Sequence, residues 1–500
     1  MFRDEINLSR REMLRHLRNI ALAGTYAMPL GLLGACSRNE TLVTSPPQDS
    51  PGGDLPESTP LSRLQYALRH ATPPARASEF ITVTQGPVQS ADPSIGGGAR
   101  IYPPPQGPGV NPNPVSLATM PQVWGHRREI WDESTIGYIE SSAGNGSWYV
   151  PIGQWHRAAT LTAYSTCGLH FIFDGQAFEI LFAGTNVQAT LVADGKYMAP
   201  GFITTALNAG VVGAPLSAPN AYVRFDFGTR ARRRISLYAS SSQGPCAIAI
   251  GSGESIEPWD RSSEPSFCAM TDSYGQAPAE NWGLGGPFWE AASLLSIPHL
   301  DLNAIGGTGY APKNGSVAAP MFGNDFVARI NTGVVTLPDL IMTAGGINDN
   351  NSTAAPPLYD SPEQARLGFN TAVNTYFSAM RAALPGTVLA AMGPWAPVES
   401  IPVNAVARSK ADTILSVMQT IDGPWIFLDN LNGSWINSAG VRTPAAVSGW
   451  QTGTGNVGRP MGDGNGDFYV SADGTHPTPA GCLYLGQVIA TQLRVAILAL

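Results

Sequence analysis

Residue types that carry acyl-transfer chemistry stand in the C-terminal half of this 500-residue chain. Ser273 follows a short apolar run, and His476 comes shortly after Asp473 near the other end of that half. A serine hydroxyl becomes a nucleophile when a neighbouring base takes its proton, and an imidazole held by a carboxylate is such a base. These residue types predict a serine nucleophile, a histidine base and an aspartate that orients the histidine.

Four short blocks carry the same residues in a fixed order and resemble the GDSL/SGNH hydrolase superfamily. The blocks are Asp272-Ser273, Gly307, Gly346-Ile347-Asn348-Asp349 and Asp473-x-x-His476. The resemblance covers residues 263–500, about half of the chain. Thr271 stands where the family usually has glycine and Tyr274 where it has leucine, so the backbone shape of the nucleophile turn departs from the family pattern.

The resemblance implies an oxyanion hole as well as a nucleophile and a base. In the family pattern its donors are the backbone N–H groups of Ser273 and Gly307 and the side-chain amide of Asn348, whereas Asp349 is structural. Such donors stabilise the charge that develops on the tetrahedral intermediate. We expect neither a metal nor a cofactor, because the set already supplies nucleophile, base and oxyanion donors.

Each of these residues also has an ordinary structural interpretation. Asp-Ser before a helix is a common cap, a histidine before proline is a common loop residue, and glycines make tight turns. The aromatic residues Trp395 and Tyr274 are candidate walls of the substrate pocket, although Trp395 fits core packing equally well. The structural interpretation of the four blocks requires four coincidences, so we favour the catalytic one.

The elements around these residues alternate between strands and helices over residues 263–500. Apolar runs at 267–270, 340–343, 388–392 and 425–428 alternate with helix-like stretches near 278–295, 362–384, 398–420 and 478–499. This alternation predicts an α/β/α, flavodoxin-like domain with a parallel sheet. In such sheets the site lies beyond the carboxyl ends of the strands, where the candidate residues stand.

Residues 125–260 show a different pattern, with short alternating strands that predict an antiparallel β-sandwich domain. The expected turns are Asp174-Gly175, Asp194-Gly195 and Gly228-Thr229. Four arginines form one basic run, which fits either an acidic polysaccharide or, as we favour, a solvated strand edge: Arg230, Arg232, Arg233 and Arg234. Cys167 and Cys246 lie in the same region and are our preferred disulfide pair, with buried thiols as the alternative.

The first residues resemble an export signal. Arg10-Arg11 precedes a mildly apolar stretch, 20–35, and the order of charge and apolarity resembles a twin-arginine (Tat) signal peptide. Residues 33–36, Leu-Gly-Ala-Cys, resemble a lipobox in which Cys36 is lipid-modified. We therefore expect a signal peptide over 1–35, a tether and irregular Pro/Gly-rich region over 36–124, and a periplasmic or surface lipoprotein anchored in the outer membrane.

The net charge of the chain and the resemblance of its predicted domains to known enzymes limit the functions that we expect. A net charge of −8 argues against nucleic acid as a partner. The predicted pairing of domains resembles two-domain carbohydrate esterases, which implies removal of acetyl groups from a carbohydrate. The alternatives are a lipase, arylesterase or thioesterase of the same superfamily, and a surface carbohydrate-binding lipoprotein without activity.

Overall fold

The computed structural model describes about three fifths of the chain and contains two β-sheets, each with its own buried core. The described residues are 59–70, 72–85, 100–102, 122–123, 137–140, 147–150, 166–182, 188–199, 203–204, 221–240, 245–251, 253–258, 264–277, 284–297, 299–304, 306–311, 337–349, 361–395, 405–444 and 449–500. The predicted signal peptide, its arginine pair and Cys36 lie outside these residues.

The C-terminal sheet has the order β15-β14-β16-β17-β18-β19. Neighbouring strands are parallel except for the β18–β19 pair, which is antiparallel. Every residue of β16 and β17 is buried, as expected for parallel strands covered on both faces. The predicted parallel sheet is therefore confirmed, with an antiparallel edge strand added. The strands are β14 (Ser266–Thr271), β15 (His299–Ala304), β16 (Leu340–Ala344), β17 (Val388–Met392), β18 (Trp425–Asp429) and β19 (Ser434–Asn437).

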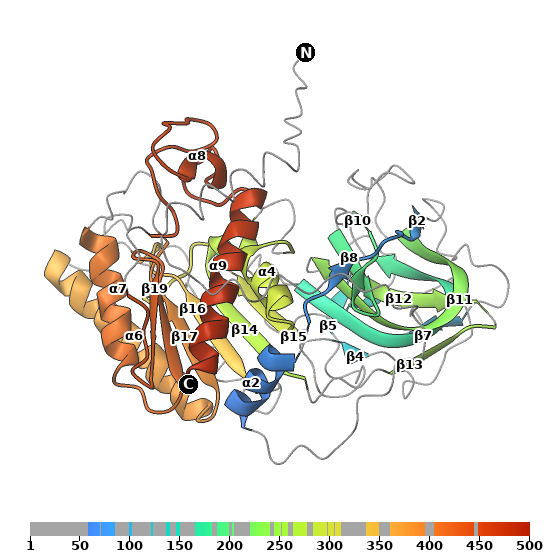
Figure 1. Ribbon diagram of the computed structural model, residues 1–500, viewed down its shortest axis with the longest axis horizontal. Helices are drawn as coiled ribbons and strands as arrows, with labels where there is room; N and C mark the ends of the chain where they lie inside the picture. The colour runs from blue at the N-terminus through green and yellow to red at the C-terminus, as the bar shows by residue number, and fades with distance from the viewer. Residues whose placement is uncertain are drawn as a thin grey trace, which may run out of the picture. The chain divides into compact units, whose positions relative to one another are not determined.

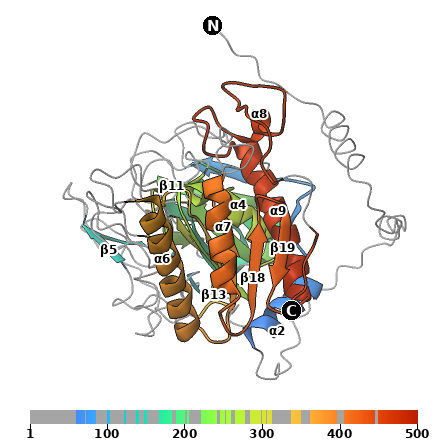
Figure 2. The same ribbon diagram turned by 90° about the vertical axis from the view of Figure 1, so that its left-hand side faces the viewer.

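Helices cover both faces of this sheet. Helices α6 (Pro362–Ala383) and α7 (Ala405–Met418) pack on one face, while α2 (Pro60–His70), α4 (Pro287–Leu294) and α9 (Pro479–Leu498) pack on the other. Figure 2 shows α6 and α7 in front of the sheet and α9 on its far side. The two short helices are α3 (Ser273–Gln276) and α8 (Gly466–Tyr469), and the α8 segment lies beyond the N-terminal end of α9 (Figure 1).

Helix α9 is the one described helix that is long and apolar enough to cross a membrane. Half of its apolar stretch is buried inside the fold, and the helix packs against α4, β18 and β19. Gly486 permits the close approach to α4, since a Cβ there would lie 2.4 Å from the Glu290 Cβ. These contacts are those of a core helix.

Helix α2 is fastened to the sheet by an ion pair as well as by apolar contacts. Arg63 Nε donates to Asp339 Oδ1 at 2.9 Å, and the Asp339 side chain is fully buried. The other carboxylate oxygen of Asp339 accepts the Ser266 backbone N–H at 2.8 Å. Asp339 thus joins α2 to the first residue of β14, at the end of the sheet opposite the candidate site.

The N-terminal sheet contains eleven of the described strands and is mostly antiparallel, as predicted. Four of these strands, and helix α2, lie within residues 36–124, so the expectation of a wholly irregular region there is wrong. Its centre is a long pair, β7 and β11, which spans both sides of the core and links the strands into one continuous sheet. The strands are β1 (Ala75–Arg76), β2 (Thr82–Gln85), β3 (Arg100–Tyr102), β4 (Gln122–Val123), β7 (Thr166–Phe182), β8 (Gln188–Ala193), β9 (Lys196–Tyr197), β10 (Ile203–Thr204), β11 (Ala221–Ser240), β12 (Pro245–Ile250) and β13 (Ser255–Pro258); β5 (Gly137–Glu140) and β6 (Ser147–Val150) pair separately.

Two of the three predicted turns in this region are wrong. Asp194-Gly195 is a turn, with both residues at positive φ, but Asp174-Gly175 lies inside β7 and Gly228-Thr229 inside β11. The β7–β11 register shifts between Asp226 and Ala231, so the extra residues of β11 bulge out while the ladder continues. Pairing along the whole length of both strands overrides the local turn signals.

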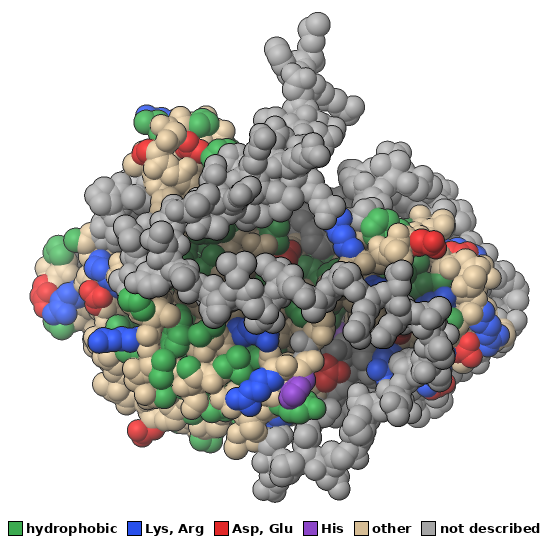
Figure 3. Space-filling view, in the orientation of Figure 1, with side chains coloured by type: hydrophobic (Ala, Val, Ile, Leu, Met, Phe, Trp, Pro, Cys, Tyr) green, Lys and Arg blue, Asp and Glu red, His purple; other side chains and the backbone are tan. Residues whose placement is uncertain are grey.

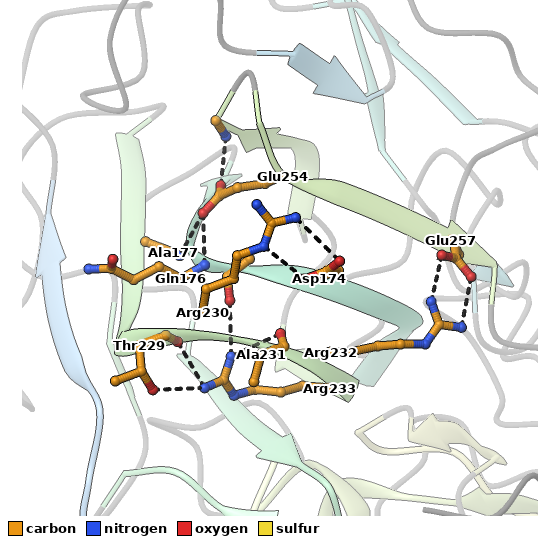
Figure 4. Close-up of polar contacts among 12 residues, drawn as sticks. Asp174, Gln176, Ala177, Thr229, Arg230, Ala231, Arg232, Arg233, Glu254 and Glu257 are labelled. Carbon is orange, nitrogen blue, oxygen red and sulfur yellow. Dashed lines mark hydrogen bonds and ion pairs between the residues drawn. The ribbon is translucent and has the colours of Figure 1, made fainter. Parts of the chain in front are cut away.

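The arginine run lies on β11 and is largely neutralised by acidic neighbours (Figure 4). Arg230 pairs with Asp174, and Arg232 forms a two-point contact with Glu257. Arg233 donates to the carbonyl oxygens of Gly175, Ala231 and Thr229, and its guanidinium lies over the Phe227 ring. These contacts agree with a solvated surface, but β11 lies between β7 and β8 and is not an edge strand. Figure 3 likewise shows basic and acidic side chains interspersed among the described residues of that face.

The predicted disulfide is not supported. The side chains of Cys167 and Cys246 lie outside the described residues, but their strands place them far apart along β7. Cys167 pairs with Ala239 at one end of β7, whereas the residues on either side of Cys246 pair with Leu181 and Phe182 at the other end. Membership of one sheet is a poor guide to pairing when a strand is seventeen residues long. The described cysteines, Cys268 and Cys482, are buried and form no disulfide.

Candidate active site

The nucleophile candidate stands on a tight turn between β14 and α3. Asp272 is the N-cap of α3, and its Oδ1 accepts the Tyr274 N–H at 3.0 Å. Because Asp272 does the capping, the hydroxyl of Ser273 is left for another partner. Gly275 is required by packing, since a Cβ there would lie 2.0 Å from Thr271 Cγ2. Thr271, the departure from the family pattern, therefore fits against a glycine on the next turn of chain.

The histidine candidate stands on a loop that is fixed by its own hydrogen bonds. The Ser471 N–H donates to the His476 carbonyl at 2.7 Å, and Gly474 makes the turn with φ of +73°. Asp473 Oδ1 accepts the N–H groups of Thr475 and His476 and the Ser471 hydroxyl, the last at 2.6 Å. The loop leads directly into α9, whose N-cap is Thr478.

The structure brings Ser273, His476 and Asp473 into one chain of hydrogen bonds. His476 Nε2 lies 2.8 Å from Ser273 Oγ, and His476 Nδ1 lies 2.6 Å from Asp473 Oδ2. With the proton on Nδ1, the carboxylate accepts a hydrogen bond from Nδ1–H, and Nε2 can accept the serine proton. The side chains of His476 and Asp473 are 37% and 49% exposed, so the base stands at the surface, where a substrate can reach it.

Hydrogen bonds keep Asp473 ionised. Partial burial acts to raise the pKa of this carboxyl, but the bonds from the Ser471 hydroxyl, the His476 ring and two backbone N–H groups outweigh it and hold the pKa well below its usual range. Asp473 therefore carries its negative charge at neutral pH.

The predicted oxyanion donors lie on two turns that adjoin the nucleophile. A Cβ on Gly306 would lie 3.7 Å from Ser273 Cβ, so the turn that carries Gly307 runs beside the serine. Gly307 has φ of +78°, a conformation that favours glycine. On the second turn, Asn348 Nδ2 donates to the Thr308 carbonyl at 3.0 Å. An amide nitrogen carries two hydrogens, so one remains for an oxyanion.

Asp349 joins these two turns, in the structural role expected for it. Its carboxylate accepts the N–H groups of Tyr310 at 3.2 Å and Ala311 at 2.8 Å. Gly309 lies against the same carboxylate, where a Cβ would be 2.4 Å from Oδ2. The Gly307 turn and the Asn348 turn are thus held in one arrangement.

The two aromatic candidates lie behind the nucleophile. Tyr274 and Trp395 are both fully buried and stack face to face, with ring centroids 4.3 Å apart and planes 6° apart. The Tyr274 hydroxyl donates to the Thr475 carbonyl. In this arrangement both rings support the site from within, as in the packing interpretation of Trp395.

Two contributors to this arrangement have only weak signals in the sequence. Ser471 accompanies Asp473 at a spacing typical of side-chain bonds within a loop. Gln276 donates to the Ala304 carbonyl and links α3 to the end of β15, which no local pattern indicates. In the described part of the chain, no group of three or more His, Cys, Asp or Glu side chains is gathered as metal ligands.

Comparison with known proteins adds fold likeness only. No protein-family model and no curated protein matches the sequence. Among solved structures, a carbohydrate esterase family 2 enzyme with a carbohydrate-binding domain from Corynascus thermopiles (Myceliophthora fergusii) is 14% identical, with a TM-score of 0.43 over 70% of this chain and 99% of that chain. The salicylyl-acyltransferase SsfX3 of a tetracycline biosynthetic pathway is 12% identical, with a TM-score of 0.46 over 80% and 98%. A family two carbohydrate esterase from Cellvibrio japonicus is 12% identical, with a TM-score of 0.43 over 76% and 96%.

Proposed function

We propose that this protein is a serine esterase that works through an acyl-enzyme. The observation that carries the proposal is the 2.8 Å contact between His476 Nε2 and Ser273 Oγ, with Asp473 on the other ring nitrogen. A serine, an imidazole and a carboxylate in this order are the parts that covalent acyl transfer requires.

The reaction follows from these contacts. Ser273 Oγ attacks the ester carbonyl while His476 Nε2 takes its proton, and Asp473 stabilises the imidazolium that forms. The negative oxygen of the tetrahedral intermediate is met by the Ser273 and Gly307 N–H groups and the Asn348 amide. His476 then gives its proton to the leaving alcohol, which departs as the C–O bond breaks. Water, deprotonated by the same imidazole, hydrolyses the acyl-serine.

For the substrate we propose an O-acetylated carbohydrate. The support is the pairing of a mostly antiparallel sheet domain with a parallel-sheet domain that carries the four sequence blocks. The alternatives within the same chemistry are a lipase, an arylesterase or a thioesterase, and the alternative without chemistry is a carbohydrate-binding surface protein.

The test compares the purified protein on aryl acetate, aryl octanoate and acetylated xylan. We expect acetate release from the first and third, and near-complete loss in Ser273→Ala and His476→Ala, with no further loss in the double variant. Ser416→Ala, which changes an exposed serine on α7, is the control and should match the parent. A Ser273→Ala protein that hydrolyses aryl acetate at the parent rate would overturn the proposal, and preference for octanoate would favour the lipase alternative.

We also propose export and lipid anchoring, on the strength of Arg10-Arg11 and the segment that ends in Cys36. The protein should incorporate radioactive palmitate and sediment with membranes, and Cys36→Ser should abolish both. Replacing the arginine pair by two lysines should leave precursor in the cytoplasm. Unchanged labelling of the Cys36→Ser variant would rule out the lipoprotein assignment.

A further inference from the structure

A lysine lies on the inward face of α7. The chain has three lysines, Lys196, Lys313 and Lys410. Lys410 is partly buried and shares its helix face with Ala407 and Ile414, which are both buried. Its Nζ donates to the Gly346 carbonyl at 2.7 Å and lies 5.8 Å from the centroid of the Phe369 ring. Burying part of a cation costs free energy, so we examined what Lys410 does at this position.

The Gly346 carbonyl, which accepts the bond from Lys410, lies at the start of the turn that carries Asn348, the candidate oxyanion donor. Gly346 follows β16 with φ of +116°, and a Cβ on it would lie 3.2 Å from the Pro394 Cβ. Asn348 comes two residues later in this turn and is held to the Thr308 carbonyl on its other side. The lysine therefore fixes the start of the short segment that aims the Asn348 amide.

Burial and a neighbouring charge act on the pKa of Lys410 in opposite directions. Burial lowers the pKa of Lys410 to about 8, and the nearby Asp349 carboxylate acts in the opposite direction. On the same helix Arg408 pairs with Asp412 and with Asp429 of β18, so these groups are engaged with one another. The Asp349 carboxylate is thus a charged group among the described residues that favours the protonated form of Lys410.

We propose that the ammonium group of Lys410 is a positioning residue that holds the Gly346–Asn348 turn in the geometry for oxyanion stabilisation. The proposal rests on the proposed esterase function. A charged donor makes a shorter and stronger bond to a carbonyl than a neutral amine. When Lys410 loses its proton, the turn relaxes and the Asn348 amide no longer meets the oxyanion. The rate of the chemical step should therefore fall at alkaline pH, with little change in substrate binding.

The first experiment reads the position directly and needs no substrate. In protein labelled with ¹³Cε-lysine and ¹⁵N-asparagine, Lys410→Arg identifies the lysine signal that it removes. That signal should titrate near pH 8, about two units below ordinary lysines, and the Asn348 side-chain amide should shift with the same midpoint. In Lys410→Met the Asn348 amide should show no such titration. The proposal would be overturned if the Lys410 signal titrated with those of the other lysines. It would also be overturned if the Asn348 amide signal did not shift as Lys410 titrates.

The second experiment measures kcat and KM against pH. The parent should lose kcat above about pH 8, Lys410→Arg should move this limb to higher pH, and Lys410→Met should have kcat about tenfold lower without an alkaline limb. KM should change less than about twofold throughout. The matched control, Lys196→Met, changes an exposed lysine on β9 and should keep the parent profile.

A loss of folded protein would not explain the predicted fall in kcat above about pH 8. The pKa of Lys410 is lower in the folded chain than its ordinary value, so its loss of a proton between about pH 8 and 10.5 favours the folded state. Above about pH 8 we therefore expect kcat to fall while the melting temperature stays the same or rises. Lys410→Met with the parent kcat and limb would overturn the inference. If the parent has no esterase activity while the two signals titrate together, the proposed function fails and the positional coupling stands.

Discussion

The hydroxyl of Tyr274 donates to the carbonyl of Thr475, which lies 201 residues away in the chain. Tyr274 is the neighbour of the candidate nucleophile, and Thr475 is the neighbour of the candidate base. The Trp395 ring is stacked on Tyr274 and fixes its plane. One partly buried hydrogen bond thus sets the separation of Ser273 and His476, although neither of its partners touches the substrate in the proposed reaction.

Removal of this bond should affect the rate more than the stability. We expect Tyr274→Phe to lower kcat about ten- to a hundredfold, because small displacements of catalytic groups are costly, and to destabilise the fold by about 1–2 kcal/mol. Aryl acetate hydrolysis and urea unfolding measure the two effects. Tyr484→Phe loses a similar bond, from its hydroxyl to the Trp450 carbonyl, and should lose stability alone. Equal kcat losses in the two variants would contradict this role.

Asp473→Asn should be a milder change than His476→Ala. The asparagine loses the charge that stabilises the imidazolium, but Asp473 is half exposed, so water also screens that charge. We expect kcat to fall about a hundredfold, against near-complete loss in His476→Ala. Because the pKa of Asp473 is held well below its usual range, loss of its charge should not limit kcat at mildly acidic pH. Steady-state kinetics of the two variants side by side would decide.

Asn348→Ala should leave measurable activity. The variant loses one of three oxyanion donors, and single donors are worth about 10²–10³ in kcat, or roughly 3–4 kcal/mol. It also loses the bond to the Thr308 carbonyl, so its melting temperature should fall slightly. A variant at the parent rate would show that the amide does not face the reacting carbonyl.

Glu290 makes stability depend on pH. Burial against α9 raises the pKa of this carboxyl to about 7, above its ordinary 4.5. The folded chain therefore holds a proton that the unfolded chain has lost between about pH 4.5 and 7, and stability falls as the pH rises through this window. Glu290→Gln should gain about 1–3 kcal/mol at pH 8 and almost nothing at pH 4.5. Urea unfolding at both pH values tests this, and an equal gain at both would refute it.

Arg63→Met should weaken the attachment of α2. The change leaves the Asp339 carboxylate buried with its arginine partner removed, which typically costs about 3–5 kcal/mol. Arg63→Met combined with Asp339→Asn should recover part of the loss, because the buried charge is then gone. Thermal unfolding measures both variants, and a double variant no more stable than the single one would show that packing, not charge, fixes the helix.

The positions of Ser273, Asp473 and His476 could be predicted because each has a local signal. Asp473 and His476 follow no strand of the sheet, because their loop lies between α8 and α9; their signal is the Asp-x-x-His spacing. Ser273 follows the apolar run of β14, and such runs indicate parallel strands whose carboxyl ends meet at one edge of the sheet. The order of elements in the C-terminal half could be predicted for the same reason, except for the two edge strands β15 and β19, neither of which is a continuous apolar run.

The rest depends on contacts between residues far apart in the sequence. The stacking of Trp395 on Tyr274 and the bond from Tyr274 to Thr475 join three separate segments, which no local pattern can indicate. Turn signals at Asp174-Gly175 failed because long antiparallel pairing outweighed them. Lys410 had a signal that was available, a rare lysine on the apolar face of a helix, but its partner Gly346 could be found only in three dimensions.

The contact between α2 and α9 limits when this protein can fold. The Gln65 side chain donates to the Ile497 carbonyl, and the two residues are 432 positions apart. A nascent chain that stops before Asp473 lacks the loop that carries His476, and it also lacks α9, which covers Leu64 and Leu68. The fold and the site therefore become complete together, once α9 has been made, so a chain cut before α9 should be both unstable and inert.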